Sequence, residues 1–121
     1  MTEAASLNVL FVCSRNQWRS PTAERVFRKM SGVNVRSAGT SRAARRTVKQ
    51  TDIDWADLIL VMEPEHALRL KKDYRQALRP GTVHVLDIPD DYQFMDPELV
   101  ELIIEAAKPL ILSAQGSASS T

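Results

Sequence analysis

The chain has 121 residues, of which 44% are apolar and 26% charged, and its formal net charge is +1. This length fits one compact domain with a modest core and argues against a second domain. The first apolar run, Leu7–Cys13, is too short to span a bilayer and follows no basic residues of the kind that open a signal peptide. We therefore expect a cytoplasmic protein with no membrane partner.

Apolar runs rich in β-branched residues alternate with amphipathic segments. Four segments are predicted to be strands, namely 7–13, 33–37, 58–62 and 82–87. Three are predicted to be helices, each opened by a cap residue or a proline: 20–32, 64–76 and 96 onward. Strands separated by helices predict a doubly wound α/β fold, with a four-stranded parallel sheet and helices on both faces.

Other segments lack such patterns. Residues 42–54 are first basic and then acidic, with little apolar periodicity, so we expect a loop that contains one helical turn. Pro109 is expected to kink or end the last helix. Residues 113–121 are small and polar and bury too little surface to be ordered, which predicts a disordered tail. We expect a flexible N-terminus over 1–6 and a domain over 7–112.

Charge is unevenly distributed along the chain. Residues 1–50 contain ten Lys and Arg against two Asp and Glu, whereas residues 51–121 contain six against thirteen. The basic half could bind nucleic acid, but the two halves together could equally place an anion site beside carboxylates that act as acids or bases. The single cysteine, Cys13, cannot form an intramolecular disulfide or a multi-cysteine metal site, so it serves either packing or chemistry.

The most informative stretch joins the first strand to the first helix. Ligands of a doubly wound fold collect at the carboxyl ends of the strands, and Cys13 ends a strand. The amides of the following helix start, together with Arg19, bind anions and favour thiolate over thiol. The guanidinium of Arg19 can also hold two phosphate oxygens. A buried cysteine and an unrelated surface arginine would be the simpler interpretation, but the strand, loop and Ser20-Pro21 helix start favour a nucleophile.

This stretch resembles the low-molecular-weight protein tyrosine phosphatase family, whose loop pattern is Cys, five residues, Arg, then Ser or Thr. The further agreements are Asn16, Pro21, the Ser-Ala-Gly-Thr of 37–40 and the Asp-Leu-Ile-Leu-Val-Met of 57–62. The resemblance covers most of residues 7–112, with a deletion between the second and third strands.

The resemblance implies a phosphate monoester hydrolase, similar to protein tyrosine phosphatases, that forms a phosphocysteine and needs no metal or cofactor. Cys13 would be the nucleophile, Arg19 the phosphate clamp, and Ser20 a hydroxyl that stabilises the thiolate. Asn16 and Ser37 would support the loop. The residues expected to bind substrate are Ser14, Arg15, Asn16, Gln17, Trp18 and Ser20.

The chain departs from the family pattern at several positions. Arg15 stands where the family commonly has Gly, and Trp18 where many members have a second Cys, so the mouth of the pocket should be bulkier and more basic. The deletion leaves no counterpart for a support histidine of some members, and Glu63 is expected to take over part of its role. His66 and His84 lack partners at metal-ligand spacing and are expected to be structural or exposed.

The general acid is expected in the loop after the last strand, where the family has an Asp. A related phosphatase that acts on the RNA polymerase II C-terminal domain has a similar Asp-Ile-x-Asp arrangement, in which the second Asp is the acid. This favours Asp90, with Asp87 as the alternative. Asp96 is interpreted as a helix cap.

Three other functions compete with hydrolysis. A phosphocysteine carrier or phosphoanion-binding protein, like the IIB component of sugar phosphotransferase systems, resembles this fold but needs neither Arg19 nor Asp90. An arsenate reductase on the same loop requires further cysteines. Nucleic-acid binding rests on the basic half alone, with no recognised motif. We therefore expect a phosphorylated substrate, a phosphoprotein or a small phosphate ester, and no nucleic-acid partner; the oligomeric state stays open.

Overall fold

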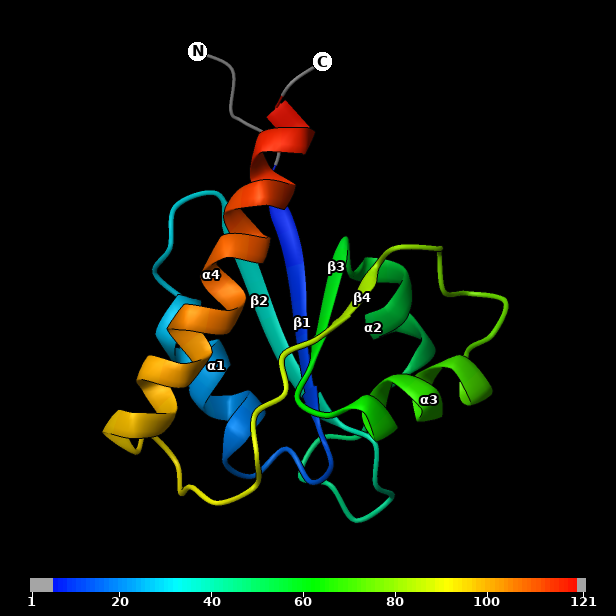
Figure 1. The fold of residues 1–121 in the computed structure, drawn as a ribbon. Helices are drawn as coiled ribbons and strands as arrows, with labels where there is room; N and C mark the ends of the chain where they lie inside the picture. The colour runs from blue at the N-terminus through cyan, green and yellow to red at the C-terminus, as the bar shows by residue number, and fades with distance from the viewer. Residues whose placement is uncertain (1–5, 120–121) are drawn as a thin grey trace.

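The computed structural model describes residues 6–119, and their side chains as far as residue 116. Its centre is a parallel sheet of four strands in the order β2-β1-β3-β4 (Figure 1). The strands are β1 (Leu7–Cys13), β2 (Val33–Gly39), β3 (Leu58–Val61) and β4 (Val83–Val85). In register, β1 pairs Leu7 with Val33 of β2 and Val9 with Leu58 of β3.

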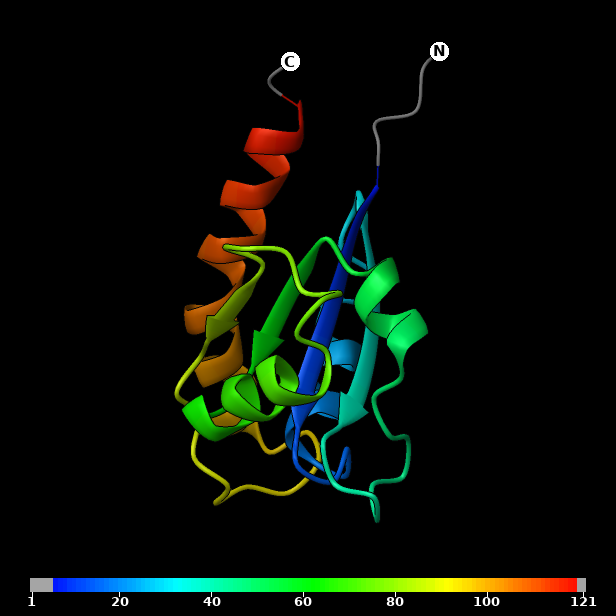
Figure 2. The same cartoon turned by 90° about the vertical axis from the view of Figure 1, so that its right-hand side faces the viewer.

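Helices cover both faces of this sheet, as the two views at right angles show (Figures 1 and 2). Helices α1 (Arg19–Phe27) and α4 (Pro97–Ser119) pack on one face, and α2 (Gln50–Trp55) and α3 (Pro64–Asp73) on the other. On each face, the two helices and the strand side chains that point toward them form one apolar cluster. The predicted α/β fold, with a four-stranded parallel sheet and helices on both faces, is confirmed.

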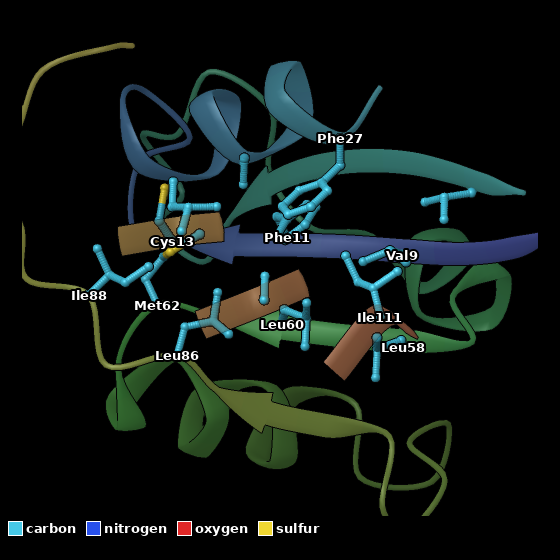
Figure 3. Close-up of a cluster of buried hydrophobic side chains, with 14 of the residues drawn as sticks. Val9, Phe11, Cys13, Phe27, Leu58, Leu60, Met62, Leu86, Ile88 and Ile111 are labelled. Carbon is cyan, nitrogen blue, oxygen red and sulfur yellow. The ribbon is translucent and has the colours of Figure 1, made fainter. Parts of the chain in front are cut away.

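The side chains of β1 alternate between the two clusters. Phe11 and Cys13 lie with α1 and α4, and the ring of Phe11 stacks on Phe27 of α1 with centroids 5.7 Å apart. Leu10 and Val12 lie with α2 and α3. Because both faces are covered, the sequence of this strand is almost continuously apolar. Figure 3 shows the Cys13 side chain at the end of the first cluster.

The helical turn predicted within residues 42–54 is α2, which is somewhat longer than predicted, with six residues from Gln50 to Trp55. Polar contacts hold this short helix in place. Asp52 is fully buried, accepts a hydrogen bond from the amide of Lys49 at 3.0 Å and pairs with Arg36 and Arg46. A helix fixed by a buried carboxylate leaves little apolar periodicity in the sequence.

The last helix was also predicted too short. Instead of a disordered tail from residue 113, α4 continues to Ser119 and passes through Pro109. Pro109 is exposed, so water can bond the carbonyl that its ring leaves free. Ala114 packs against the core, and Gln115 Nε2 donates to the carbonyl of Ser31 at 3.0 Å. Residues 1–5 of the predicted flexible N-terminus lie outside the described residues, as do residues 120 and 121.

Smaller differences concern where helices end. Helix α1 begins at Arg19 and ends at Phe27, ahead of the predicted end at Gly32, and α3 ends at Asp73. Gly32 has a φ of 78° and forms the turn into β2. Asp96 caps α4 as predicted, because its Oδ1 accepts the amide hydrogen of Glu98 at 2.9 Å.

Parallel strands place the loops that follow them at one edge of the sheet. In Figure 1 the segments that follow β1, β2, β3 and β4 lie together at the lower end of the molecule. Cys13, Arg19, Glu63 and Asp90 belong to these segments or to the helix start next to them. None of the helices in residues 6–119 combines the length and apolar character that a membrane crossing needs.

Candidate active site

Cys13 lies at the base of a tight loop. It is the last residue of β1 and is 3% exposed, and residues 14–18 lead from it to α1. The amide of Asn16 folds back and donates to Cys13 Sγ at 3.2 Å. The helix start adds a second contact, because Ser20 Oγ lies 2.9 Å from the same sulfur. An amide donor and a hydroxyl beside the sulfur stabilise negative charge on it.

Asn16 connects this loop to its surroundings. It adopts a left-handed backbone with a φ of 54°, which asparagine tolerates better than most residues. Its Nδ2 donates to Ser20 Oγ at 3.0 Å and to Ser37 Oγ at 2.9 Å. Ser37 in turn donates to the carboxylate of Glu24 on α1. The structure thus brings together Asn16 and Ser37, both predicted to support the loop, although their roles stay predictions.

Gly39 allows β2 to pass close to the loop. A Cβ at this position would lie 2.5 Å from the carbonyl oxygen of Ser14 and 2.6 Å from Cβ of Ala44. The residue after Gly39 also bonds the loop, since the amide of Thr40 donates to the carbonyl of Cys13 at 3.0 Å. The absence of a side chain at Gly39 is therefore a requirement of the loop's position.

Arg19 is held by the loops that follow β3 and β4. It is 2% exposed, and its Nη1 donates to Glu63 Oε1 at 2.9 Å and to the carbonyl of Ile88 at 2.8 Å. Its Nε lies 3.5 Å from Asp90 Oδ1, a longer ion pair. Nη2 makes no hydrogen bond to any residue that the structure describes. One edge of the guanidinium is thereby fixed, while the edge formed by Nε and Nη2 can grip two oxygens of a phosphate.

A cavity of about 240 Å³ opens above Cys13. Its lining consists of Cys13, Ser14, Arg15, Gln17, Trp18, Arg19 and Asp90. These include most of the residues predicted to bind substrate, together with the predicted nucleophile, clamp and acid. Asn16 and Ser20 lie behind the loop instead, where they bond to Cys13.

The two candidate acids, Asp87 and Asp90, differ in their position relative to the cavity. Asp90 is 58% exposed and lines the cavity, with its carboxylate toward Arg19. Asp87 is exposed, has a left-handed φ of 58° and is not part of the cavity lining. Between them Ile88 is buried, and its carbonyl bonds to Arg19. Of the two, only Asp90 lines the cavity, and its role as the acid stays a prediction.

His66 contributes to the site in a way that the sequence analysis missed. This residue of α3 is 2% exposed, and its Nε2 lies 2.9 Å from Ser14 Oγ. Its Nδ1 accepts the amide hydrogen of Glu63 at 3.0 Å, so Nε2 carries the ring hydrogen and donates to Ser14. Burial, and next the charge of Arg19, lower the pKa of His66 to about 4, so the ring is neutral at pH 7.

A sequence signal for His66 did exist. Glu63 is the cap residue of α3, Pro64 is the first helical residue and His66 is the third, the position whose side chain reaches back to the cap amide. The expectation that His66 is structural or exposed rested only on its lack of partners at metal-ligand spacing. It is buried and contacts the loop from the side of α3, beside Glu63.

Comparison with known proteins agrees with this geometry. The model of the low molecular weight phosphotyrosine protein phosphatase family matches residues 8–51, which include the whole loop. No curated protein sequence gives a match.

Solved structures match over most of the chain. Wzb from Vibrio vulnificus, in complex with benzylphosphonate, has 26% identity, a TM-score of 0.72 and coverage of 90% of this chain and 99% of its own. A low molecular weight phosphotyrosine phosphatase from Vibrio cholerae O395 has 23% identity, a TM-score of 0.71 and coverage of 91% and 97%. The YwlE arginine phosphatase from Geobacillus stearothermophilus has 24% identity, a TM-score of 0.65 and coverage of 88% and 94%. The predicted resemblance to this phosphatase family is confirmed.

Proposed function

From its match to the low molecular weight phosphotyrosine protein phosphatase family, which supports a phosphatase function, we propose that this protein hydrolyses phosphate monoesters through a phosphocysteine on Cys13. The observation that carries the proposal is a cavity lined by Cys13, Arg19 and Asp90 together. The Cys13 sulfur at this cavity has two hydrogen-bond partners, the amide of Asn16 and the hydroxyl of Ser20. A nucleophile, a phosphate clamp and an acid are the three parts that this chemistry requires.

In the first step the Cys13 thiolate attacks phosphorus, and the bond between phosphorus and the leaving oxygen breaks. Asp90 gives its proton to that oxygen, which leaves as an alcohol or phenol. Arg19 holds two of the phosphoryl oxygens through Nε and Nη2, and the amides of the loop stabilise the negative charge that these oxygens carry. Ser20 stabilises the sulfur as a thiolate.

In the second step a water molecule attacks the phosphocysteine. Asp90, now a carboxylate, takes a proton from this water, and the bond between phosphorus and sulfur breaks. Inorganic phosphate leaves and the thiolate is restored, with Ser20 again donating to it. A phosphocysteine carrier would pass the phosphoryl group to an acceptor and would need no acid. The position of Asp90 in the cavity lining therefore favours hydrolysis.

The substrate class within this reaction is also a proposal. The mouth of the cavity carries the exposed Arg15 and Gln17 and the half-buried Trp18, which suits a phosphorylated side chain of a protein or a small phosphate ester. Wzb from Vibrio vulnificus holds benzylphosphonate, an aryl-bearing phosphate analogue, which makes phosphotyrosine the first substrate to test. The cytoplasmic location and the lack of nucleic-acid or membrane partners stay predictions from the sequence.

The test is a hydrolysis assay with aryl phosphates in the presence of a chelator. Wild-type protein should release phosphate, and Cys13→Ser should release none while still binding a phosphate analogue. Arg19→Lys keeps the charge but loses two-point recognition, so it should lose most of the activity. A panel of peptides with phosphotyrosine, phosphoserine or phosphoarginine then identifies the preferred group. Full activity in Cys13→Ser would contradict the proposal.

A further inference from the structure

Three arginines of the segments that follow β1 and β2 have no charge partner among the residues that the structure describes. Arg15 lines the cavity, and Arg42 and Arg45 lie in the segment that follows β2. All three side chains are exposed, and none forms a hydrogen bond or ion pair with another residue that the structure describes. We refer to Arg15, Arg42 and Arg45 as the arginine rim.

The neighbouring arginines differ from this rim in their partners. Arg36 and Arg46 both pair with the buried carboxylate of Asp52, and Arg36 also lies over the ring of Trp55 at 4.1 Å. These two arginines hold α2 and β2 together. The rim arginines have no such structural task, so their charges are available to a ligand.

Backbone hydrogen bonds hold the segment that contains Arg42 and Arg45 against the loop of residues 14–18. The amide of Ser41 donates to the carbonyl of Ser14 at 2.9 Å, and the amide of Arg45 donates to the carbonyl of Arg15 at 3.0 Å. Arg42 lies between these two anchors. The backbone of the basic segment is therefore held against the loop that lines the Cys13 cavity.

A second cavity continues from the loop toward Arg45. Its volume is about 350 Å³, and its lining consists of Asn16, Pro21, Glu24, Arg36, Ser37, Arg45 and Arg46. Asn16 belongs to the same loop as Arg15, so the two cavities lie on opposite sides of this loop. Among its three arginines, only Arg45 is not already paired with Asp52. Arg42 lines a further cavity, of about 380 Å³, on the side of α3.

We infer that the substrate is a phosphorylated peptide segment with acidic side chains next to the phosphorylated residue, and that the arginine rim binds these side chains. The inference rests on the proposed function, since it needs the phosphate in the Cys13 cavity. A small phosphate ester would fill that cavity and leave Arg42 and Arg45 unused. An extended peptide reaches beyond the cavity, where its carboxylates meet cations that lack a partner.

The exposure of the arginine side chains determines how large the preference for an acidic peptide should be. Ion pairs of exposed side chains contribute little each, so two such pairs should favour an acidic peptide by about three- to tenfold in kcat/KM at low salt. Since the Debye length is about 10 Å at 0.1 M salt, the preference should shrink as salt is added.

The experiment compares two phosphotyrosine peptides of equal length. One carries Glu on both sides of the phosphotyrosine, and the other carries Gln at the same positions. Their kcat/KM values are measured for wild-type protein, for the double variant Arg42→Gln/Arg45→Gln and for the control Arg75→Gln. Arg75 is an exposed arginine beyond the end of α3 that is remote from Glu63 and His66. Hydrolysis of phenyl phosphate by each protein gives the basal activity.

Wild type and Arg75→Gln should prefer the Glu peptide, and the double variant should hydrolyse both peptides equally while its activity on phenyl phosphate is unchanged. Equal hydrolysis of the two peptides by wild type would overturn the inference and leave the phosphatase proposal standing. If no phosphate is released from any substrate, the phosphatase proposal fails, and the same peptides are compared by their affinity for Cys13→Ser. Equal affinities there, or tighter binding of an RNA oligonucleotide that the double variant loses, would overturn the inference.

Discussion

Arg19 shows how single residues define the site. Its side chain is almost fully buried, so its charge needs partners, and Glu63 and Asp90 supply them from two different loops. These two contacts differ in kind. Glu63 accepts a short hydrogen bond on the Nη1 edge, whereas Asp90 makes a longer contact on the edge that faces the cavity. In the proposed reaction the phosphate replaces Asp90 at Arg19, and Asp90 then protonates the leaving group.

Replacing the two candidate acids in turn tests this assignment. Asp90→Asn should slow the hydrolysis of phenyl phosphate by about a hundred- to ten-thousand-fold, because phenolate is a poor leaving group without a proton. The same variant should be much less impaired on nitrophenyl phosphate, whose leaving anion is stable. Asp87→Asn, the matched control outside the cavity, should show a small defect of equal size on both esters. An exchange of these behaviours between the two variants would make Asp87 the acid.

His66 predicts a pH dependence of stability. Its pKa of about 4 in the folded protein lies below the ordinary 6.5, so the unfolded chain binds this proton more readily. The contribution of His66 to the free energy of unfolding is therefore complete above pH 6.5 and is lost as the pH falls from 6.5 toward 4. The steepest loss is about 1.4 kcal/mol for each pH unit.

Unfolding by urea between pH 7 and 4 measures this effect. In His66→Gln the amide can still donate to Ser14, but it does not titrate. The difference in free energy of unfolding between wild type and this variant should therefore change with pH in that window. Parallel curves for the two proteins would show that His66 does not carry the effect.

At the scale of elements, the strands were the easiest part to predict. A buried parallel strand leaves a continuous apolar run, and β1 and β3 both have one. Helix α2 leaves no such pattern, because its fixed point is the carboxylate of Asp52 and its arginine partners come from other segments. The last turns of α4 depend on Gln115 and Ser31, which are far apart in sequence. Contacts of this kind cannot be recognised from local composition.

The end of β2 packs closely against the loop of residues 14–18, which predicts that a side chain at Gly39 disturbs this loop. Gly39→Ala places a Cβ within 2.5 Å of the Ser14 carbonyl, so the backbone of the loop must move. We expect a loss of about 1–3 kcal/mol in the free energy of unfolding and a clear fall in kcat on nitrophenyl phosphate. Gly116→Ala is the control, because a Cβ there meets no atom within 4 Å from any other part of the described chain. Wild-type kcat in Gly39→Ala would show that the loop tolerates the shift.

For the whole molecule, the parallel sheet explains why much of the site could be predicted. Loops that follow different strands meet at one edge, so Cys13, Ser37, Glu63 and Asp90 could be expected together without any knowledge of their contacts. That Asp90 lines the cavity and Asp87 does not could be seen only in the structure, because the sequence places both residues in the same loop. The contact between His66 and Ser14 links α3 to the loop after β1, and it too required the tertiary arrangement.

The whole-molecule arrangement also explains the uneven charge of the sequence. Basic residues of the first half supply Arg19 and the arginine rim, and the acidic second half supplies Glu63 and Asp90. The fold brings the two halves together at the carboxyl edge of the sheet. An anion site next to carboxylates, one of the two explanations of the charge pattern, agrees with this geometry.

The most direct test of the account is to trap the phosphorylated enzyme. Asp90→Asn is mixed with nitrophenyl phosphate, quenched rapidly in acid and digested, and the peptide that contains Cys13 is examined by mass spectrometry. Because this variant forms the intermediate from a good leaving group but lacks the base for its breakdown, we predict a phosphate group on Cys13 in stoichiometric amount, and none in Cys13→Ser. Release of nitrophenol by the variant without phosphate on Cys13, or with phosphate on another residue, would contradict the account.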